Sequence, residues 1–296
     1  QLSDLQKNQL SAEIKRIKTD KRFAAPALAK GNKTATEYDS KVANYSTVTN
    51  IVALPDGRKL FVVYNYPTSW IHRSLDGLMK RLTGCRMKKA NSSQWKEKFE
   101  SKSRIPTIDC EDANTVVMPF LPNINLHDLF ANKDSIQDFG ECEFARGVNV
   151  EKLLGIVDKI VAEVEDIHKQ DVTWGELILP NIIIDKDEKV HICDPEISYD
   201  ANVPINEQKA RDLLDLIISI AASLQKYSVN YELTVNRVLK SYADKEVIKE
   251  LQNLAGQKPG LLQKLFFGYT KARLGLKDKA QWQDIKDAIV KYGNSD

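Results

Sequence analysis

The chain has 296 residues, of which 43 are basic and 41 acidic, giving a formal net charge of +2. Domains usually contain roughly 100–200 residues, so this length allows either one large two-part unit or two ordinary domains. Hydrophobic residues make up 42% of the chain, a share typical of globular proteins with a buried core. Because the two signs of charge nearly cancel, we expect no nucleic-acid partner, which needs a concentrated basic face.

The cysteines and the apolar runs indicate where the protein works. Cys85, Cys110, Cys142 and Cys193 are widely spaced, whereas zinc sites and disulfide frameworks need closely grouped or abundant cysteines. We therefore expect reduced thiols and a cytoplasmic protein. The longest apolar run, residues 213–224, is too short to span a bilayer, so we expect no transmembrane segment, and the N-terminus has no hydrophobic signal core.

The N-terminal 36 residues form a charged leader. An apolar stripe runs along residues 1–22 and predicts a helix; it consists of Leu2, Leu5, Leu10, Ile14 and Ile17. Residues 23–36 are expected to be a linker. A helix of this kind usually packs on the edge of a domain with its charges in water, and docking to a partner protein or a membrane surface is the alternative.

From residue 37 the pattern becomes β-rich. Residues 47–54 and 59–66 contain many β-branched and aromatic residues and flank the turn sequence Pro55-Asp56-Gly57-Arg58, which predicts a hairpin. The other expected elements are a helix at residues 70–82, a loop or short helix at 86–102, and short strands at 105–110 and 115–121.

Beyond residue 123 the chain becomes mainly helical. The apolar side chains of residues 150–168 recur with a clear 3.6-residue period, which predicts a long amphipathic helix. A strand-rich passage interrupts the helices at residues 182–193. Further helices are expected at residues 207–225, 231–242 and 246–254, with two more before the C-terminus.

The most informative segment is residues 168–196, which joins the end of the long helix to a β-hairpin. Asn181 follows five residues after Glu176, and Asp194 stands at the end of the hairpin. When the hairpin folds back, it can bring the Asn181 amide and the Asp194 carboxylate toward a common point. Such oxygen ligands suit Mg²⁺ bound to phosphates, because Mg²⁺ keeps several waters and takes few protein ligands.

In these residues the sequence resembles the protein-kinase superfamily, whose catalytic loop His-x-Asp-x-x-x-x-Asn is followed after a hairpin by Asp-Phe-Gly. Glu176 stands where the family has its catalytic Asp, the step to Asn181 is the same, and Asp194 stands on the metal-binding Asp. The tripeptide at Trp174 and the helix end at His168 resemble those of small atypical kinases of the lipopolysaccharide-sugar, RIO and KEOPS-complex types.

Two further segments carry the resemblance. Residues 114–121, which include Met118, Phe120 and Leu121, resemble the hinge strand between the kinase lobes. Residues 209–214 resemble the start of the central helix of the C-lobe, whose Asp, here Asp212, anchors the catalytic loop.

The resemblance implies an α+β, two-lobed protein-kinase-like fold with a small β-rich N-lobe and a larger, mostly helical C-lobe. Residues 1–36 would be the N-terminal helix and linker, residues 37–121 the N-lobe with its hinge, and residues 122–296 the C-lobe.

Several positions depart from the family pattern. Residues 42–47 lack the glycines that let a backbone approach phosphates closely. Tyr64 stands where the third strand should carry a phosphate-binding Lys, and the Glu that should pair with it aligns near Ser74. Lys41 and Lys59 are candidate substitutes for the missing Lys.

The catalytic position and the segment after it also differ. Glu176 is one methylene longer than Asp, and a misplacement of about 1 Å can cost ~100-fold in rate. Residues 195–211, which separate Asp194 from Asp212, number only 17, too few for a conventional activation segment. We therefore expect no activation-loop switch and no extended peptide groove.

The resemblance implies an atypical phosphotransferase that depends on ATP and Mg²⁺. Asn181 and Asp194 would hold the metal, and Glu176 would orient or deprotonate the acceptor hydroxyl of a small molecule or of the protein itself. The residues implied in nucleotide binding are Met118, Phe120, Leu121, Lys59 and Tyr64. Asp212 and His168 would support the catalytic loop.

Two alternatives remain open at this point. A pseudokinase would use the same fold as a nucleotide-sensing or protein-interaction module; Tyr64, Ser74 and Glu176 favour it, whereas Asn181 and Asp194 favour phosphotransfer. The weaker alternative discards the resemblance and leaves a two-domain α+β protein of unassigned function.

Overall fold

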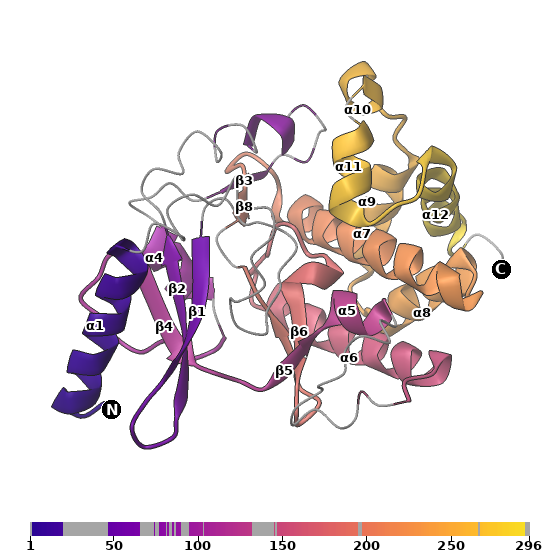
Figure 1. Cartoon of the computed structure of the whole chain (residues 1–296). Coiled ribbons are helices and arrows are strands. Elements are labelled where there is room, and N and C mark those ends of the chain that lie inside the picture. Colours follow the sequence, from indigo (N-terminus) through magenta and orange to yellow (C-terminus); the bar gives the residue numbers. More distant parts are fainter. Residues whose placement is uncertain are drawn as a thin grey trace. The chain divides into compact units, whose positions relative to one another are not determined.

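The structure is a computed structural model of the chain, and it describes residues 2–19, 47–65, 74, 77–80, 82, 85, 87–89, 95–102, 104–131, 145, 147–194, 197–265 and 267–293. The chain divides into two compact units. The first contains Gln1–Asp76 and Ala90–Phe120, and the second contains Gly77–Lys89 and Leu121–Asp296. The first unit is a small antiparallel sheet with helices and the second is mostly helical, so the α+β class is confirmed (Figure 1).

In the described part of the first unit, three antiparallel strands form a sheet in the order β1–β2–β4. β1 (Thr47–Ala53) and β2 (Lys59–Asn65) are the predicted hairpin, and β4 (Thr115–Pro119) pairs with the other edge of β2. Gly57 in the turn has a φ of 84°, a left-handed conformation that glycine adopts without steric cost.

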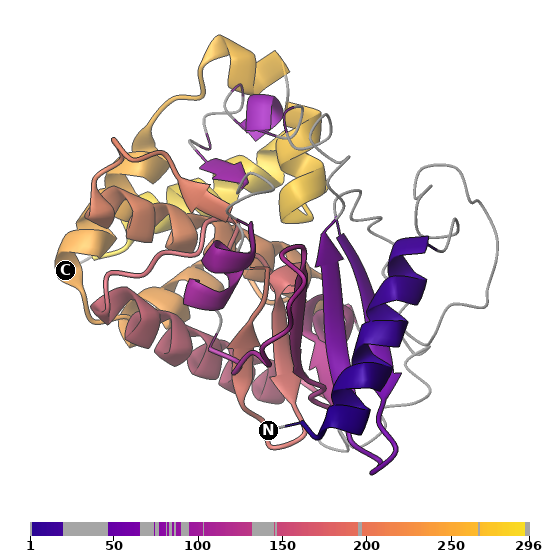
Figure 2. The same ribbon diagram turned by 90° about the vertical axis from the view of Figure 1, so that its left-hand side faces the viewer.

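Helices cover both faces of this sheet, because successive side chains of a strand point to opposite sides. One face packs against α1 (Asp4–Thr19), as Figure 2 shows, and this cluster includes Leu10, Ile14, Val62, Tyr64 and Val117. The other face packs against α4 (Trp95–Lys102), and this cluster includes Val63, Trp95, Phe99, Val116 and Met118.

The helix predicted for residues 1–22 is confirmed as α1, although its stripe is only partly buried. Leu10 and Ile14 are buried, whereas Leu5 is 69% exposed. The Gln6 amide donates to the carboxylate of Asp56 in the β1–β2 turn at 2.6 Å. This helix is therefore an integral part of the first unit.

The strand predicted at residues 105–110 is wrong. Only an isolated bridge joins Ile108 to Val117 in this stretch, through a 2.7 Å hydrogen bond from the Ile108 N–H. Pro106 supplies the reason, because a proline has no N–H to donate to a ladder. The predicted linker at residues 23–36, Lys41 and most of the helix at residues 70–82 lie outside the described residues.

Helices dominate the second unit (Figure 1). Their bounds are α5 (Leu126–Phe130), α6 (Val150–Lys169), α7 (Ile205–Leu224), α8 (Tyr231–Ser241), α9 (Lys245–Gly256), α10 (Leu261–Leu265), α11 (Phe267–Leu274) and α12 (Lys279–Lys291). Side-chain caps fix several of their first turns: the Asn149, Asn230 and Asp244 side chains accept from the N–H groups at the starts of α6, α8 and α9.

The described part of the second unit also contains two small antiparallel sheets. One has the order β5–β6–β7, with β5 (Asn123–Asn125), β6 (Ile182–Asp185) and β7 (Val190–Ile192). The other pairs β3 (Met87–Lys89) with β8 (Ile197–Tyr199). Short 3₁₀ turns lie at η3 (Leu179–Asn181) and η4 (Gln225–Tyr227). None of the helices in the described part of the chain is long and apolar enough to cross a membrane.

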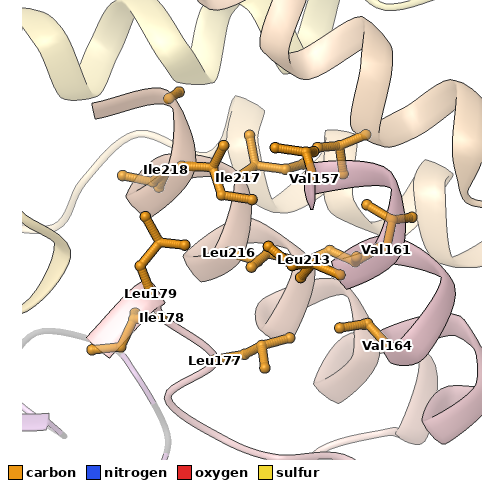
Figure 3. Close-up of a cluster of buried hydrophobic side chains, with 14 of the residues drawn as sticks. Val157, Val161, Val164, Leu177, Ile178, Leu179, Leu213, Leu216, Ile217 and Ile218 are labelled. Carbon is orange, nitrogen blue, oxygen red and sulfur yellow. The ribbon is translucent and has the colours of Figure 1, made fainter. Parts of the chain in front are cut away.

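The core of the second unit includes side chains of α6 and α7. Val157, Val161 and Val164 of α6 gather around Leu213 of α7, and the segment 177–179 joins them (Figure 3). The 3.6-residue period along α6 is the reason for this arrangement, since it places the valines on one face. The segment that follows the candidate catalytic residue is thereby built into the core.

Leu213→Ala tests this core, because Leu213 is completely buried. We expect a loss of about 2–5 kcal/mol in the free energy of unfolding, from lost burial and the cavity left behind. The control is Leu233→Ala on α8, where the side chain is 48% exposed and a change within about 0.5 kcal/mol is expected. Urea unfolding followed by circular dichroism measures both, and equal losses would contradict the assignment of the core.

Candidate functional site

The candidate catalytic loop begins where α6 ends, at the buried His168. Its Nδ1 lies 2.9 Å from the Tyr242 hydroxyl and its Nε2 lies 3.3 Å from Oδ2 of Asp212. Burial raises the pKa of Tyr242, which keeps its hydroxyl protonated. If this hydroxyl donates to Nδ1, the proton on Nε2 can be donated to Asp212, and both contacts are satisfied.

The carboxylate of Asp212 holds the loop backbone. It is fully buried and accepts hydrogen bonds from the N–H of Trp174 at 2.7 Å, the N–H of Gly175 at 2.9 Å and the hydroxyl of Tyr199 at 2.8 Å. Burial, together with the charge of Asp212, raises the pKa of Tyr199, so this hydroxyl remains a donor. The oxygen atoms of the buried Asp212 carboxylate thus accept hydrogen bonds from donors on α6, the loop and β8.

Gly175 brings the loop into close contact with β8. Its φ is 81°, and a Cβ added there would lie 2.8 Å from Cγ2 of Ile197. Glu176 follows with a φ of 45°. A non-glycine residue in this left-handed region stores of order 1–3 kcal/mol of strain, which persists only where the surroundings impose it.

Asn181 is fixed against the backbone of Glu176. Its Nδ2 donates to the Glu176 carbonyl at 2.9 Å, and the N–H of Ile178 donates to the same carbonyl at 3.0 Å. Because the amide nitrogen is used in this way, the Asn181 Oδ1 is the atom suited to binding a metal.

The β6–β7 hairpin brings Asp194 next to Asn181. Ile182 pairs with Ile192, and the N–H of Cys193 donates to the Asn181 carbonyl at 2.7 Å, which extends the ladder by one pair. Asp194 follows at once, with a φ of 58°. The two oxygen ligands expected from the sequence therefore stand on neighbouring rungs of one hairpin.

Trp174 and Cys193 lie behind this hairpin end. The indole N–H of Trp174 donates to the Cys193 carbonyl at 2.6 Å. Burial, with a smaller effect from the Asp194 charge, raises the pKa of the Cys193 thiol to about 12. The thiol is therefore neutral at physiological pH.

Lys80 is the site residue that sequence reasoning missed. It lies in the helical stretch 77–80 of the second unit, and its Nζ is 3.1 Å from Oε2 of Glu176. The side chains are 1% and 14% exposed. The family pattern directed attention to Tyr64 and Ser74 instead, and no spacing in the sequence connects Lys80 with Glu176.

The residues expected to bind nucleotide do not converge in the first unit. Tyr64 is buried on the sheet face that α1 covers, and burial raises its pKa. Met118 is buried on the opposite face, against α4. Lys59 is exposed at the start of β2, with its Nζ 5.8 Å from the centre of the Phe120 ring. Leu121 is half-buried and begins the second unit.

The ligand set of the candidate site suits Mg²⁺ better than a transition metal. Among the described residues, no group of three or more His, Cys, Asp or Glu side chains is placed to hold a metal ion. Asn181 and Asp194 would supply two oxygen ligands, and Mg²⁺ is the ion that commonly takes its remaining ligands from water and phosphate.

Comparison with known proteins gives only distant similarity. No protein-family model matches the sequence, and no curated protein matches it. Among solved structures, the chain is similar to a MAP kinase from Leishmania major, with 10% sequence identity and a TM-score of 0.36. The similarity covers 83% of this chain and 77% of that one. Neither an activity nor a ligand follows from a likeness of this kind.

The order of the described elements agrees with the order that the resemblance implied. An antiparallel sheet ends in β4, a helical unit follows, and within that unit a loop held by Asp212 of α7 leads into the β6–β7 hairpin. The particular types of atypical kinase named above are not distinguished by this order.

Gly175→Ala tests the tight loop. We expect a loss of about 1–3 kcal/mol in the free energy of unfolding, because Ala is strained at positive φ and its Cβ would collide with Ile197. Gly155→Ala in α6 is the matched control: nothing lies within 4 Å of its added Cβ, so a gain of about 0.5–1 kcal/mol is expected. Thermal unfolding of the two variants checks this, and a neutral Gly175→Ala would show that the loop is not held as described.

Proposed function

We propose that the protein is a kinase-like phosphotransferase that uses ATP and Mg²⁺ and acts on a small non-peptide acceptor or on itself. One observation carries this proposal: hydrogen bonds hold the loop at three successive places. Asp212 accepts from the N–H groups of Trp174 and Gly175, Asn181 donates to the carbonyl of Glu176, and the N–H of Cys193, next to Asp194, donates to the carbonyl of Asn181. Phosphoryl transfer depends mainly on positioning and charge stabilisation, and these hydrogen bonds supply positioning.

Each residue has a role in the proposed reaction. The Asn181 Oδ1 and the Asp194 carboxylate would hold Mg²⁺, whose charge offsets that of the phosphates. Glu176 would orient the acceptor hydroxyl and take its proton as the acceptor oxygen bonds to the γ-phosphorus. The bond between that phosphorus and the bridging oxygen breaks, and ADP leaves with the electron pair.

The segment between Asp194 and α7 supports a small acceptor. Its strand β8 pairs with β3, and Tyr199 of β8 donates to Asp212. A segment tied to the catalytic loop in this way is poorly suited to the movements of an activation loop. The protein would thus work without a peptide platform in this segment.

A pseudokinase is the second candidate, and the position of Tyr64 favours it. This residue stands where a phosphate-binding Lys would be expected, and it is buried in the apolar cluster beneath α1. A nucleotide could not reach this side chain unless α1 moved. Under this candidate, the fold would bind nucleotide without turnover or would bind only protein partners.

Two variants of the second unit test the proposed reaction. In Asp194→Ala, the Mg²⁺-dependent share of binding to a non-hydrolysable ATP analogue is expected to be lost. In Glu176→Gln, binding is expected to persist while turnover falls by about 100-fold or more, the usual contribution of a general base. Calorimetry measures the binding, and release of ADP measures the turnover.

The controls are Asp187→Ala on the same hairpin and Glu188→Gln, whose carboxylate forms a half-exposed ion pair with Lys159. Both are expected to behave as the wild-type protein does. Turnover that persists in Asp194→Ala and Glu176→Gln would refute these roles. Mg²⁺-dependent binding without turnover in the wild-type protein would favour the nucleotide-sensing pseudokinase, and no binding at millimolar nucleotide would favour a protein-binding one.

A further inference from the structure

The Lys80–Glu176 ion pair places a buried cation directly at the candidate catalytic carboxylate. The Lys80 side chain is 1% exposed and its Nζ lies 3.1 Å from Oε2 of Glu176, whose own side chain is 14% exposed. Removing an ammonium group from water is expensive, and a buried ion pair is often no more stabilising than well-packed apolar residues of similar size. Stability alone is therefore a poor reason for a lysine at this position.

A second buried cation lies in the same region but is committed elsewhere. Two hydrogen bonds, of 2.5 and 2.9 Å, join the Arg273 guanidinium to the Asp215 carboxylate. Burial alone would lower the pKa of Arg273, but the charge of Asp215 above all, and also that of Glu176, raises it. Of these two cations, Lys80 is thus the one whose carboxylate partner is a candidate catalytic residue.

An acceptor hydroxyl held by Glu176 fixes where the phosphoryl group must arrive. The attacking oxygen contacts both the carboxylate and the phosphorus, so the phosphoryl oxygens come close to the group beside the carboxylate. That group is the Lys80 ammonium, a compact charge with three donors that suits phosphate oxygens.

We propose that Lys80 is the phosphoryl-binding cation of this site. It pairs with Glu176 in the resting protein and turns its donors toward the γ-phosphoryl group when MgATP binds. It keeps its proton throughout, while the acceptor proton goes to Glu176. This inference rests on the proposed phosphotransfer function. Under it, Lys80 supplies the positive charge for the phosphates that is missing where Tyr64 replaces the Lys of the family pattern.

Lys80→Met tests this role through the difference between two nucleotides. The affinity for the Mg²⁺ complex of a non-hydrolysable ATP analogue is expected to fall about tenfold or more, as for loss of a hydrogen bond to a charged group. The affinity for MgADP, which lacks the γ-phosphoryl group, is expected to change far less. Calorimetry on the full chain measures both, with Lys159→Met as the control, because Lys159 forms a half-exposed ion pair on the same unit.

The ratio of the affinity for the ATP analogue to the affinity for MgADP separates the outcomes. A ratio that stays unchanged in Lys80→Met, while the wild-type protein binds both nucleotides, would assign Lys80 a merely structural role and leave the proposed function intact. A wild-type protein that binds neither nucleotide would overturn both proposals. Should Lys80→Met fail to fold, Lys80→Arg takes its place: it keeps the charge but changes its geometry, so a reduced ratio supports the inference and an unchanged ratio overturns it.

Discussion

A carboxylate can be buried at tolerable cost only where donors surround it, and this constraint organises the second unit around Asp212. Its donors come from the loop at Trp174 and Gly175 and from Tyr199 of β8, and His168 at the end of α6 completes the set. Asp212 itself stands on α7, whose side chains lie in the same core as those of α6 (Figure 3). The loop therefore takes its position from α7 and from the end of α6, both of which are anchored in this core.

The contacts that hold the loop also hold its backbone in a strained conformation. Gly175, Glu176 and Asp194 all have positive φ, and for the two carboxylate residues this costs of order 1–3 kcal/mol each. The network around Asp212 and the ladder contact between Asn181 and Cys193 offset that cost. Residues 177–179, directly after the strained turn, are buried in the core, so relaxing the turn would disturb core packing. The hydrogen bonds around Asp212 and the packing of the core therefore hold the strained geometry of the candidate site.

The sequence allowed correct prediction of the elements that depend on local patterns. The β1–β2 hairpin follows from its turn residues, and α6 follows from the 3.6-residue period of its apolar side chains. The spacing from Glu176 to Asn181 and Asp194 also led to residues that the hairpin register brings together. The nucleotide-binding set stays a prediction, and the strand register separates two of its side chains: Tyr64 pairs with Thr115 and Met118 with Phe61, an odd offset that puts Tyr64 and Met118 on opposite faces. Lys80 could not be predicted, because its partner is 96 residues away.

Charge balance helps to distinguish a working site from a relic of one. Glu176 and Asp194 contribute two negative charges and Lys80 one positive charge, so a single Mg²⁺, as proposed, would make the set net positive and suited to a polyphosphate. Replacing a buried ion pair by apolar residues of similar size is often neutral or stabilising. A fold that no longer handled phosphate would gain little from keeping Lys80 beside Glu176. The proposed phosphate binding would give the pair a purpose that stability does not, and the proposal of phosphoryl chemistry in the second unit rests on this difference.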